Sequence, residues 1–363
     1  ERQARAMSRR HLEVRDFRCI AATNLEFDGR CNLISGANAS GKTSLLEAIF
    51  VLGRGRSFRT ARTEILIRNG TEAFTLAGKV AGAGRIRPLG MRVSREGIEA
   101  RVSGRPVNGL AELATVLPAQ AIDPEVHRLV EGGPQERRRY IDWGVFHVEP
   151  SFVDHWRRYQ RALRQRNAAL RTQQPASVVH AWDPELIEAG QLVADYRIRY
   201  MSQLVSHVAE VGVRLLGEPV EIALNQGWSA DRTLEEATRH SWARDAERGL
   251  THSGPHRADL SVRFGGAVAR DRVSRGQQKL AAASLLLGQL RCDAQQGSDV
   301  AALLVDDPAA ELDSSNLERL LTEVISLPAQ LFVTALDPKN PSLRHLPAGR
   351  RFHVEHGAVT RLL

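Results

Sequence analysis

The sequence predicts an α/β protein that combines a phosphate-binding loop, an antiparallel β layer and a mainly helical arm. A short apolar segment, residues 31–35, leads through a glycine-rich loop into a helical pattern at 44–52. Residues 72–110 alternate between apolar and polar side chains and contain turn signals, as antiparallel hairpins do. After residue 258, strand and helix patterns alternate, which is typical of an α/β sheet.

Residues 151–217 interrupt this rhythm with helical patterns. Apolar and aromatic residues recur at helical spacing from 152 to 170 and again from 184 to 216. We expect two long helices that pack as an antiparallel pair, with the aromatic stripe of the first in the core. The remaining expected strands are 219–224, 258–263, 301–305 and 330–335, and the remaining expected helices are 234–248, 275–291 and 314–326.

Composition excludes several classes of protein. The 363 residues are 42% hydrophobic and 25% charged, which is ordinary for a folded globular chain. No apolar run approaches the ~20 residues that a membrane crossing needs, and the first ten residues are polar and arginine-rich. Cys19, Cys31 and Cys292 are too few and too scattered for a disulfide framework or a metal cluster. We therefore expect a cytoplasmic protein with no membrane partner.

The charge balance is mildly basic. The net charge is +8, from 50 basic and 42 acidic residues, and lysine occurs at only four positions. An arginine excess permits nucleic-acid binding, because each guanidinium can grip a phosphate with two donors. A GC-rich genome favours arginine codons as well, so composition leaves both explanations open.

The glycine-rich loop fits the pattern G-x-x-x-x-G-K-[ST] in full and lies between a strand and a helix, as this motif requires. Its backbone N–H groups and the amino end of the helix can surround phosphate oxygens. We expect Lys42 to reach the β- and γ-phosphates of ATP, and the Thr43 hydroxyl to ligate Mg²⁺. The expected nucleotide-binding residues are Gly36, Ala37, Asn38, Ala39, Ser40, Gly41, Lys42, Thr43 and Ser44.

A pair of carboxylates follows the apolar segment 301–305. Asp306 and Asp307 come at its carboxyl end, where α/β sheets bind ligands. We expect Asp306 to hold Mg²⁺ through water, and Asp307 to polarise the water that attacks ATP. Gln120 follows another apolar stretch and is expected to contact both Mg²⁺ and this water. These groups predict ATP hydrolysis.

Three further segments resemble motifs of ABC-type ATPases. Asp313 stands at the position of the D-loop aspartate, and Thr334 stands where ABC transporters usually have a switch histidine. A segment 32 residues before Asp306 resembles the LSGGQ signature, by which one subunit of this class completes the ATP site of another. The gap of 232 residues after Lys42 is typical of SMC-like DNA-repair ATPases. The signature residues are Ser274, Arg275, Gly276 and Gln277.

The ordered set of motifs resembles the RecF family of bacterial recombination mediators and spans nearly the whole chain. Two positions depart from the family's pattern: Ala39 replaces a frequent glycine of the loop, and Val273 replaces the leucine of the signature. Both are small apolar changes, and we expect nucleotide binding despite them. The segments that carry the resemblance are 16–18, 36–43 with 45–48, 55–60, 129–130, 133–134, 137–139, 142–144 with 147 and 149–150, 164–167, 251 with 254–257, 274–279, 306–307 and 311–313.

The resemblance implies an ABC/SMC-like P-loop ATPase head with an antiparallel β layer, plus a helical arm subdomain. The ATPase lobe would comprise 1–148 and 250–363, and the arm, or lobe II, 149–249. The implied protein binds single-stranded, gapped or junction DNA, forms a homodimer on ATP, and has weak ATPase activity that DNA stimulates. It would act with RecO and RecR to load RecA in DNA repair and replication restart, would support SOS induction, and would be associated with the nucleoid.

Clustered arginines are candidates for further contacts. Arg59 lies in a basic stretch after the first helix and is expected to touch the nucleotide. Arg157, Arg161 and Arg164 share one face of the arm and could follow a DNA backbone. The alternative for this arm face is the solvated side of an amphipathic helix.

Two other functions are alternatives to the mediator. One is a structural SMC-like clamp, which would tether DNA and hydrolyse ATP only incidentally. ATP turnover that DNA stimulates would favour the mediator over this clamp. A transporter ATPase subunit is disfavoured by the helical arm and by threonine at the switch position.

Overall fold

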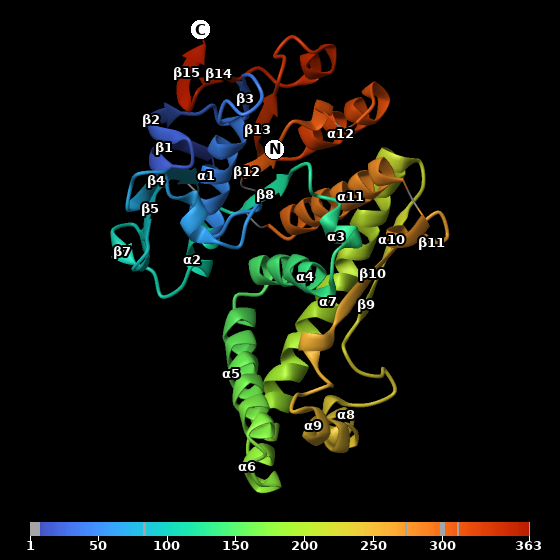
Figure 1. Ribbon diagram of the computed structural model, residues 1–363. Coiled ribbons are helices and arrows are strands. Elements are labelled where there is room, and N and C mark those ends of the chain that lie inside the picture. The colour runs from blue at the N-terminus through green and yellow to red at the C-terminus, as the bar shows by residue number, and fades with distance from the viewer. Residues whose placement is uncertain (1–7, 83–84, 273, 298–301, 311, 363) are drawn as a thin grey trace. The chain divides into compact units, whose positions relative to one another are not determined.

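The computed structural model describes residues 8–82, 85–272, 274–297, 302–310 and 312–362 (Figure 1). Val273 of the signature segment and Glu311 before the D-loop aspartate lie outside the described residues. The chain forms two compact units, one of residues 1–126 and 297–363 and the other of residues 127–296. The expected boundaries after 148 and 249 differ from this division and stay a prediction.

A mostly parallel sheet carries the first unit. Its strand order is β15-β14-β3-β13-β12-β8, and every neighbouring pair is parallel except β14–β15. The residues of β3, β12 and β13 are buried throughout, as is usual for the central strands of a parallel sheet. The strands are β3 (Cys31–Ser35), β8 (Ala119–Ile122), β12 (Ala302–Val305), β13 (Gln330–Ala335), β14 (Arg350–Glu355) and β15 (Ala358–Leu362).

An antiparallel sheet forms a second layer of this unit and confirms the β layer expected from the alternating sequence. Its order is β2-β1-β4-β5-β6-β7, with pairs such as Leu12 opposite Leu25 and Leu76 opposite Met91. The strands are β1 (Ser8–Phe17), β2 (Ile20–Glu26), β4 (Ala73–Gly82), β5 (Arg85–Ser94), β6 (Gly97–Val102) and β7 (Arg105–Pro106).

One apolar core joins both sheets to α1 (Lys42–Arg54), which is buried over most of its length. Phe17 and Phe74 meet edge to face in the antiparallel layer, with ring centroids 5.0 Å apart, and Phe27 makes similar contacts with Phe332 and Phe352. The remaining helical elements of this unit are η1 (Thr63–Leu66), α2 (Ala111–Val116), η3 (Pro308–Ala310), α12 (Ser314–Ser326) and η4 (Pro341–His345).

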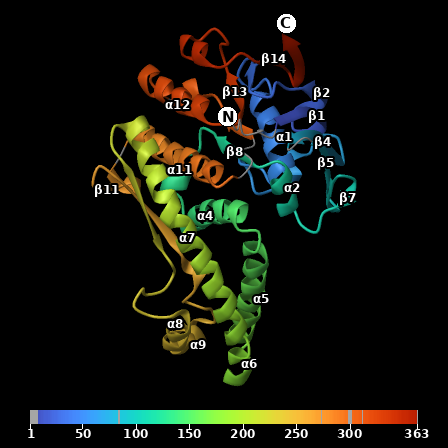
Figure 2. The same ribbon diagram turned by 180° about the vertical axis from the view of Figure 1, so that it is seen from behind.

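The second unit is mainly helical and is organised by the 34-residue α7 (Asp183–Leu216), which packs against α5 and α11. Figure 1 and the reverse view in Figure 2 both show α5 alongside α7, as expected for the antiparallel pair. A three-stranded sheet has the order β11-β10-β9. The other elements are α3 (Arg128–Glu131), α4 (Pro134–Val148), α5 (Phe152–Arg171), α6 (Ala176–His180), β9 (Val220–Asn225), α8 (Leu234–His240), α9 (Trp242–Arg248), η2 (Pro255–Arg257), β10 (Asp259–Phe264), β11 (Ala267–Val268), α10 (Ala269–Arg272) and α11 (Arg275–Gln295).

Buried arginines hold these helices together. Arg166 is fully buried and donates to carboxylates of Asp183 and Asp245, both at 2.8 Å, and to the Thr251 hydroxyl. Removing one partner of such a buried pair is strongly destabilising, because the other charge is left without compensation. Arg166 and Thr251 belong to the segments that carry the family resemblance, and within the described chain they make structural contacts.

Two sequence expectations for the arm were wrong in detail. The helix expected at 234–248 is two helices, because Ser241 ends α8 and its hydroxyl donates to the Thr238 carbonyl oxygen. Trp156, expected in the core, is 36% exposed. Within the described ranges, no helix has both the length and the apolar character that a membrane crossing requires.

A buried carboxyl group lies where α7 packs against α11. Tyr200 on α7 donates to Asp293 Oδ1 on α11 at 2.8 Å, and Asp293 is only 7% exposed. Burial raises the pKa of Asp293 to about 7, although the hydrogen bond from Tyr200 opposes this shift. The α7–α11 contact therefore contains a carboxyl group that binds a proton near neutral pH.

The variant Asp293→Asn should change how stability depends on pH. The raised folded-state pKa stabilises the wild type fully below the unfolded value of about 3.9, and this contribution is lost as the pH rises to about 7. Asparagine keeps an acceptor for Tyr200 but does not titrate. Urea unfolding should show the variant more stable than wild type at pH 8, by on the order of 4 kcal/mol. The exposed control Asp195→Asn should keep the wild-type slope, and equal slopes for Asp293→Asn and wild type would contradict the assignment.

Candidate functional site

The loop between β3 and α1 needs its glycines. Gly36 and Gly41 have φ angles of 156° and 114°, and a Cβ on Gly36 would collide with the Val354 carbonyl oxygen. Ala39, where the family resemblance expected glycine, lies at φ 60°, a left-handed conformation that costs an alanine roughly 1 kcal/mol. Helix α1 begins directly after Gly41, so the first N–H groups of the helix point into the loop.

Lys42 holds the loop in its curved shape. Its ammonium group donates to the carbonyl oxygens of Gly36 at 2.7 Å and Ala37 at 2.9 Å, and the side chain is 6% exposed. A buried cation so close to the free N–H groups of a helix creates a strongly electropositive cradle. The loop expected from the sequence is therefore compact, and Lys42 faces the position that an anion would occupy.

The central feature of the site is the carboxylate of Asp306, at the end of β12. Thr43 Oγ1 on α1 donates to it at 2.9 Å, and Thr334 Oγ1 at the end of β13 donates to it at 2.7 Å. Burial raises the pKa of Asp306 above its ordinary value, although both hydroxyl hydrogen bonds oppose this shift. Three expected site residues from separate segments therefore meet at one carboxylate.

Thr334 also supports the neighbouring residue. The backbone N–H of Asp307 donates to Thr334 Oγ1 at 2.8 Å, and Asp307 has a φ of 43°. This conformation is rare for a residue with a side chain, and the hydrogen bond helps to maintain it. The Asp307 carboxylate remains partly exposed beside the buried Asp306.

An ion pair under the loop was missed by sequence reasoning. Glu47 on α1 is fully buried and accepts two hydrogen bonds from Arg18, at 2.8 and 2.9 Å, and one from Ser57. Arg59, the expected nucleotide contact, lies 3.7 Å from the same carboxylate and is half exposed. The available signal was a glutamate within an otherwise apolar helix, since an ionised group there needs a partner.

The loop is also fastened to the β14–β15 turn. The N–H of Gly357 donates to the Ser40 carbonyl oxygen at 2.8 Å, and Gly357 has a φ of 79°. A Cβ on Gly357 would collide with the Cys19 carbonyl oxygen. Ser44, in the first turn of α1, is buried, with its hydroxyl 3.6 Å from Cys19 Sγ. Two turns from distant segments therefore hold the phosphate loop from outside.

Two other expected residues are placed less directly. Gln120 lies within β8 opposite Leu303, three positions before the level of Asp306, and its role stays a prediction. The residue that follows β8 is Asp123, which the sequence analysis did not assign and which lies nearer in register to Asp306, because the N–H of Asp306 bonds to Ile122. Asp313 caps α12 by accepting from the Asn316 N–H at 2.9 Å, and this hydrogen bond lowers its pKa.

The signature segment lies in the second unit and begins α11. Ser274 and Gln277 form a reciprocal capping box, in which each side chain accepts a hydrogen bond from the backbone N–H of the other. Arg275 and Gly276 follow in the first turn, and a Cβ on Gly276 would meet no atom within 4 Å. Neither packing within the described chain nor backbone conformation requires glycine there.

The arginine face expected on the arm is present on α5. Arg157, Arg161 and Arg164 are all exposed, and Arg157 lies 3.7 Å from the exposed carboxylate of Asp154. Exposed ion pairs of this kind contribute little to stability, so this arginine can exchange partners freely. The face is accessible, and its contact with DNA stays a prediction.

Comparison with known proteins assigns the class. The family model for the RecF/RecN/SMC N terminal domain matches residues 9–345. A solved Smc head bound to the C-winged helix domain of ScpA aligns over 98% of this chain and 97% of that chain, with a TM-score of 0.59 and 16% identity. That likeness shows the fold alone. With the phosphate loop, it defines an ABC/SMC-like ATPase head and confirms the expected fold class.

Closer relatives identify the family. "DNA replication and repair protein RecF" of Thioalkalivibrio sulfidiphilus is 39% identical over 352 residues, covering 96% of this chain and 98% of that protein. Its namesake in Shewanella frigidimarina is 39% identical over 358 residues, covering 98% and 99%. A structure of "the recombination mediator protein RecF-ATP in RecFOR pathway" aligns over all of both chains, with a TM-score of 0.90 and 25% identity. The chain belongs to the RecF family, as the sequence resemblance indicated.

The variant Thr334→Val should destabilise the first unit. Valine has nearly the same shape, but it removes the donor to Asp306 and the acceptor for the Asp307 N–H. Leaving such buried groups unpaired costs about 1–3 kcal/mol, which should lower the thermal unfolding temperature measured by circular dichroism. Thr334→Ser keeps the hydroxyl and should lose less stability. A valine variant as stable as wild type would show that this network contributes nothing.

Proposed function

We propose that this chain is an ATP-dependent, DNA-binding recombination mediator in DNA repair and replication restart. The observation that carries the proposal is the meeting of the phosphate loop with Asp306 and Thr334 at the carboxyl edge of the parallel sheet. Membership in the RecF family supports the choice of nucleotide, because a solved RecF structure is described with ATP. The expectation of nucleoid association belongs to this proposal as well.

The phosphates of ATP are proposed to bind along residues 36–44 at the amino end of α1. Lys42 would exchange its hydrogen bonds with the loop carbonyl oxygens for bonds with β- and γ-phosphate oxygens. Arg59 is supported as a further contact by its exposure and by its long, 3.7 Å separation from Glu47. Backbone N–H groups supply the remaining donors, and they need no reorganisation because the loop is already curved.

The oxygen donors at this edge fit Mg²⁺. Magnesium prefers hard oxygen ligands and is usually held by one or two protein groups together with phosphates and water. Thr43 and Asp306 would hold it, and Gln120 is proposed as a further contact. When bound, the ion neutralises charge on the phosphates. Asp123, at the end of β8, is an additional candidate on this edge.

Hydrolysis is proposed to depend on Asp307, with Thr334 positioning it. The partly exposed Asp307 carboxylate can polarise water, while the hydrogen bond from its N–H to Thr334 holds the Asp307 backbone in its left-handed conformation. An aspartate side chain is short, so we expect turnover to be slow and to act as a switch. Thr334 would occupy the position of the switch residue, but its hydroxyl cannot act as a base at neutral pH.

An ATP-dependent homodimer is proposed through the signature residues 274–277. Glycine within a helix costs about 1 kcal/mol relative to alanine, and nothing in the described chain accounts for Gly276. The ATP phosphates of a second subunit, approaching the amino end of α11, would account for it. Asp313 at the start of α12 is proposed to lie at the same interface, because its capping role leaves it exposed.

DNA and protein partners complete the proposal. The basic net charge and the exposed arginine face of α5 support contacts with DNA phosphates, which release counterions and weaken steeply with salt. The protein would bind single-stranded, gapped or junction DNA. It would act with RecO and RecR in loading RecA and in SOS induction, a role supported by the RecFOR description of the solved relatives.

A structural DNA clamp with incidental hydrolysis is the second candidate. The fold shared with Smc heads favours it, since a head can serve tethering as well as loading. Measuring ATP turnover with and without gapped DNA separates the two candidates. Stimulation by DNA supports the mediator, and turnover that DNA leaves unchanged supports the clamp.

Nucleotide binding should depend on Lys42. Lys42→Met keeps the length of the side chain without its charge and should abolish binding of a fluorescent ATP analogue. Lys42→Arg should bind but lose hydrolysis, because a planar guanidinium fits the phosphate cradle poorly. The exposed control Lys79→Met should behave as wild type in both binding and phosphate release. Unchanged turnover in Lys42→Arg would contradict the role assigned to this lysine.

ATP should induce dimerisation, and a substitution of Ser274 should show whether the signature lies in the dimer interface. Ser274→Arg should bind ATP as a monomer but fail to dimerise, because its bulk and charge occupy the amino end of α11. Asp307→Asn should accumulate the dimer, since ATP persists. ATP favours the dimer because it binds the dimer more tightly than the monomer. ADP has no γ-phosphate and therefore lacks this difference in affinity. Light scattering with ATP and ADP gives the mass, and the exposed control Ser202→Arg should dimerise normally. If Ser274→Arg still forms an ATP-dependent dimer, the signature does not lie in the dimer interface.

A further inference from the structure

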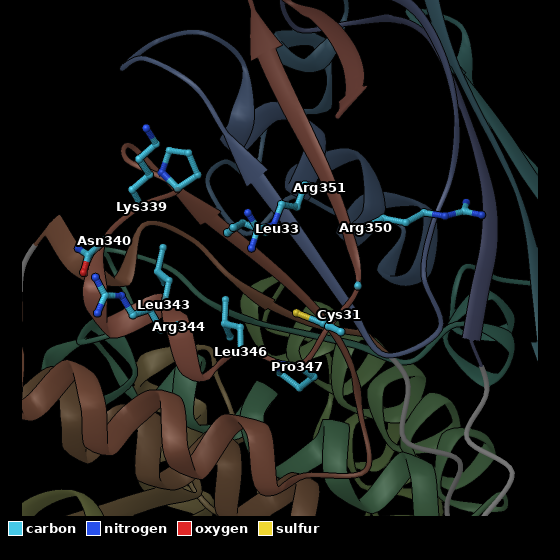
Figure 3. Close-up of a pocket in the computed structure, with 13 residues that line it drawn as sticks. Cys31, Leu33, Lys339, Asn340, Leu343, Arg344, Leu346, Pro347, Arg350 and Arg351 are labelled. Carbon is cyan, nitrogen blue, oxygen red and sulfur yellow. The ribbon is translucent and has the colours of Figure 1, made fainter. Parts of the chain in front are cut away.

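A pocket of about 570 Å³ opens on the parallel sheet of the first unit (Figure 3). It is lined by residues of β3, β14, η4 and the segments beside η4, and none of its lining residues belongs to the phosphate loop. Its size is typical of sites that bind a small molecule or a few residues of a peptide. The pocket therefore has room for a ligand of its own.

The floor of the pocket is apolar. Leu33 of β3 and Leu343 of η4 are buried, and Leu346 is partly buried beside them. Cys31 adds its sulfur to this surface, and burial, with a smaller contribution from the Asp28 carboxylate, raises the pKa of its thiol to about 11, so the group stays neutral. Pro338 and Pro347 extend the same surface. A bulky aliphatic side chain would exchange water for these contacts.

The rim of the pocket is cationic. Lys339, Arg344 and Arg351 are exposed, and no carboxylate lies within ion-pair distance of any of them in the described ranges. Figure 3 shows Lys339 and Arg344 on one side and Arg351 beside Leu33 on the other. The lining residues include no aspartate or glutamate, so three cations surround an apolar floor without internal compensation.

The fourth cationic residue that lines the pocket, Arg350, already forms an ion pair. Arg350 pairs with Glu26 at 3.4 Å, and Figure 3 shows its side chain directed away from the other labelled residues. The nearby Asp337 accepts the backbone N–H of Lys339 at 2.8 Å, which fixes the turn without touching the Lys339 ammonium. The uncompensated charge of the pocket therefore comes from Lys339, Arg344 and Arg351.

We propose that this pocket binds a short acidic peptide segment of a partner protein, anchored by an aliphatic side chain. The anchor fills the leucine-lined floor, and flanking carboxylates pair with the three cations, which speeds encounter and fixes orientation. Single-stranded nucleic acid fits this site less well. Base binding usually relies on aromatic stacking, and no aromatic side chain is among the lining residues.

The site goes beyond the proposed ATP-dependent function and is separate from it. Leu33 and Arg351 pair in register on one face of the sheet. Their neighbours Ile34 and Phe352 belong to the core cluster with α1, on the opposite face. Peptide binding should therefore be measurable without nucleotide, so failure of ATP binding and failure of peptide binding are distinguishable.

The test uses the full chain and a fluorescein-labelled, amidated peptide of sequence Asp-Glu-Asp-Glu-Leu-Leu, followed by fluorescence anisotropy without nucleotide. The double variant Arg344→Glu with Arg351→Glu should bind at least tenfold more weakly, because repulsion replaces attraction. Leu346→Ser should also weaken binding. The control Arg95→Glu with Arg101→Glu reverses two exposed arginines of β5–β6 that do not line the pocket, and it should bind within twofold of wild type.

Several outcomes would overturn the proposal. No binding of the peptide to wild type at millimolar concentration would do so, as would equal affinity in wild type and in the pocket double variant. If wild type binds the peptide Asp-Glu-Asp-Glu-Ser-Ser as tightly as the leucine peptide, binding does not depend on an aliphatic anchor. A single-stranded oligonucleotide that displaces the peptide, and itself binds the double variant poorly, would assign the pocket to DNA.

Discussion

The carboxylate of Asp306 is the point on which the first unit depends. It accepts hydrogen bonds from Thr43, at the start of α1, and from Thr334, at the end of β13. These bonds are possible only if β3, β13 and β12 are parallel and in register, since each contributes its carboxyl end to the same edge. A buried carboxylate without such donors is costly, so sheet order and site geometry stabilise one another.

The same sheet offers two chemically different surfaces. Its carboxyl edge presents helix N–H groups and Lys42, which suit phosphate, while one of its faces presents Leu33 beside the cationic rim of the pocket. Alternation along β3 and β14 makes this possible, because adjacent residues point to opposite faces. One set of strands can therefore support a nucleotide site and a separate peptide site without shared side chains.

The second unit combines an apolar core along α7 and α11 with buried ion pairs. Arg166 joins α5 to Asp183, the first residue of α7, and to Asp245 of α9, and the capping box of Ser274 sets the first turn of α11. These interactions are directional, so they fix helix register in a way that leucine contacts alone do not. Arg166, which belongs to a segment that carried the family resemblance, thus positions α5, α7 and α9 relative to one another.

The sequence by itself determined the elements and motifs whose signals are local. The strand–loop–helix at 31–52, the long helices of the arm and the spacing of the signature before Asp306 all depend on near neighbours, and the structure has these elements. Only the tertiary structure decided which distant groups meet. The pairing of Arg18 with Glu47, the support of Ser40 by Gly357, and the gathering of Leu33, Arg344 and Arg351 around one pocket join segments far apart in the chain. No local pattern encodes such contacts, because they depend on strand order and on the layers that cover each face.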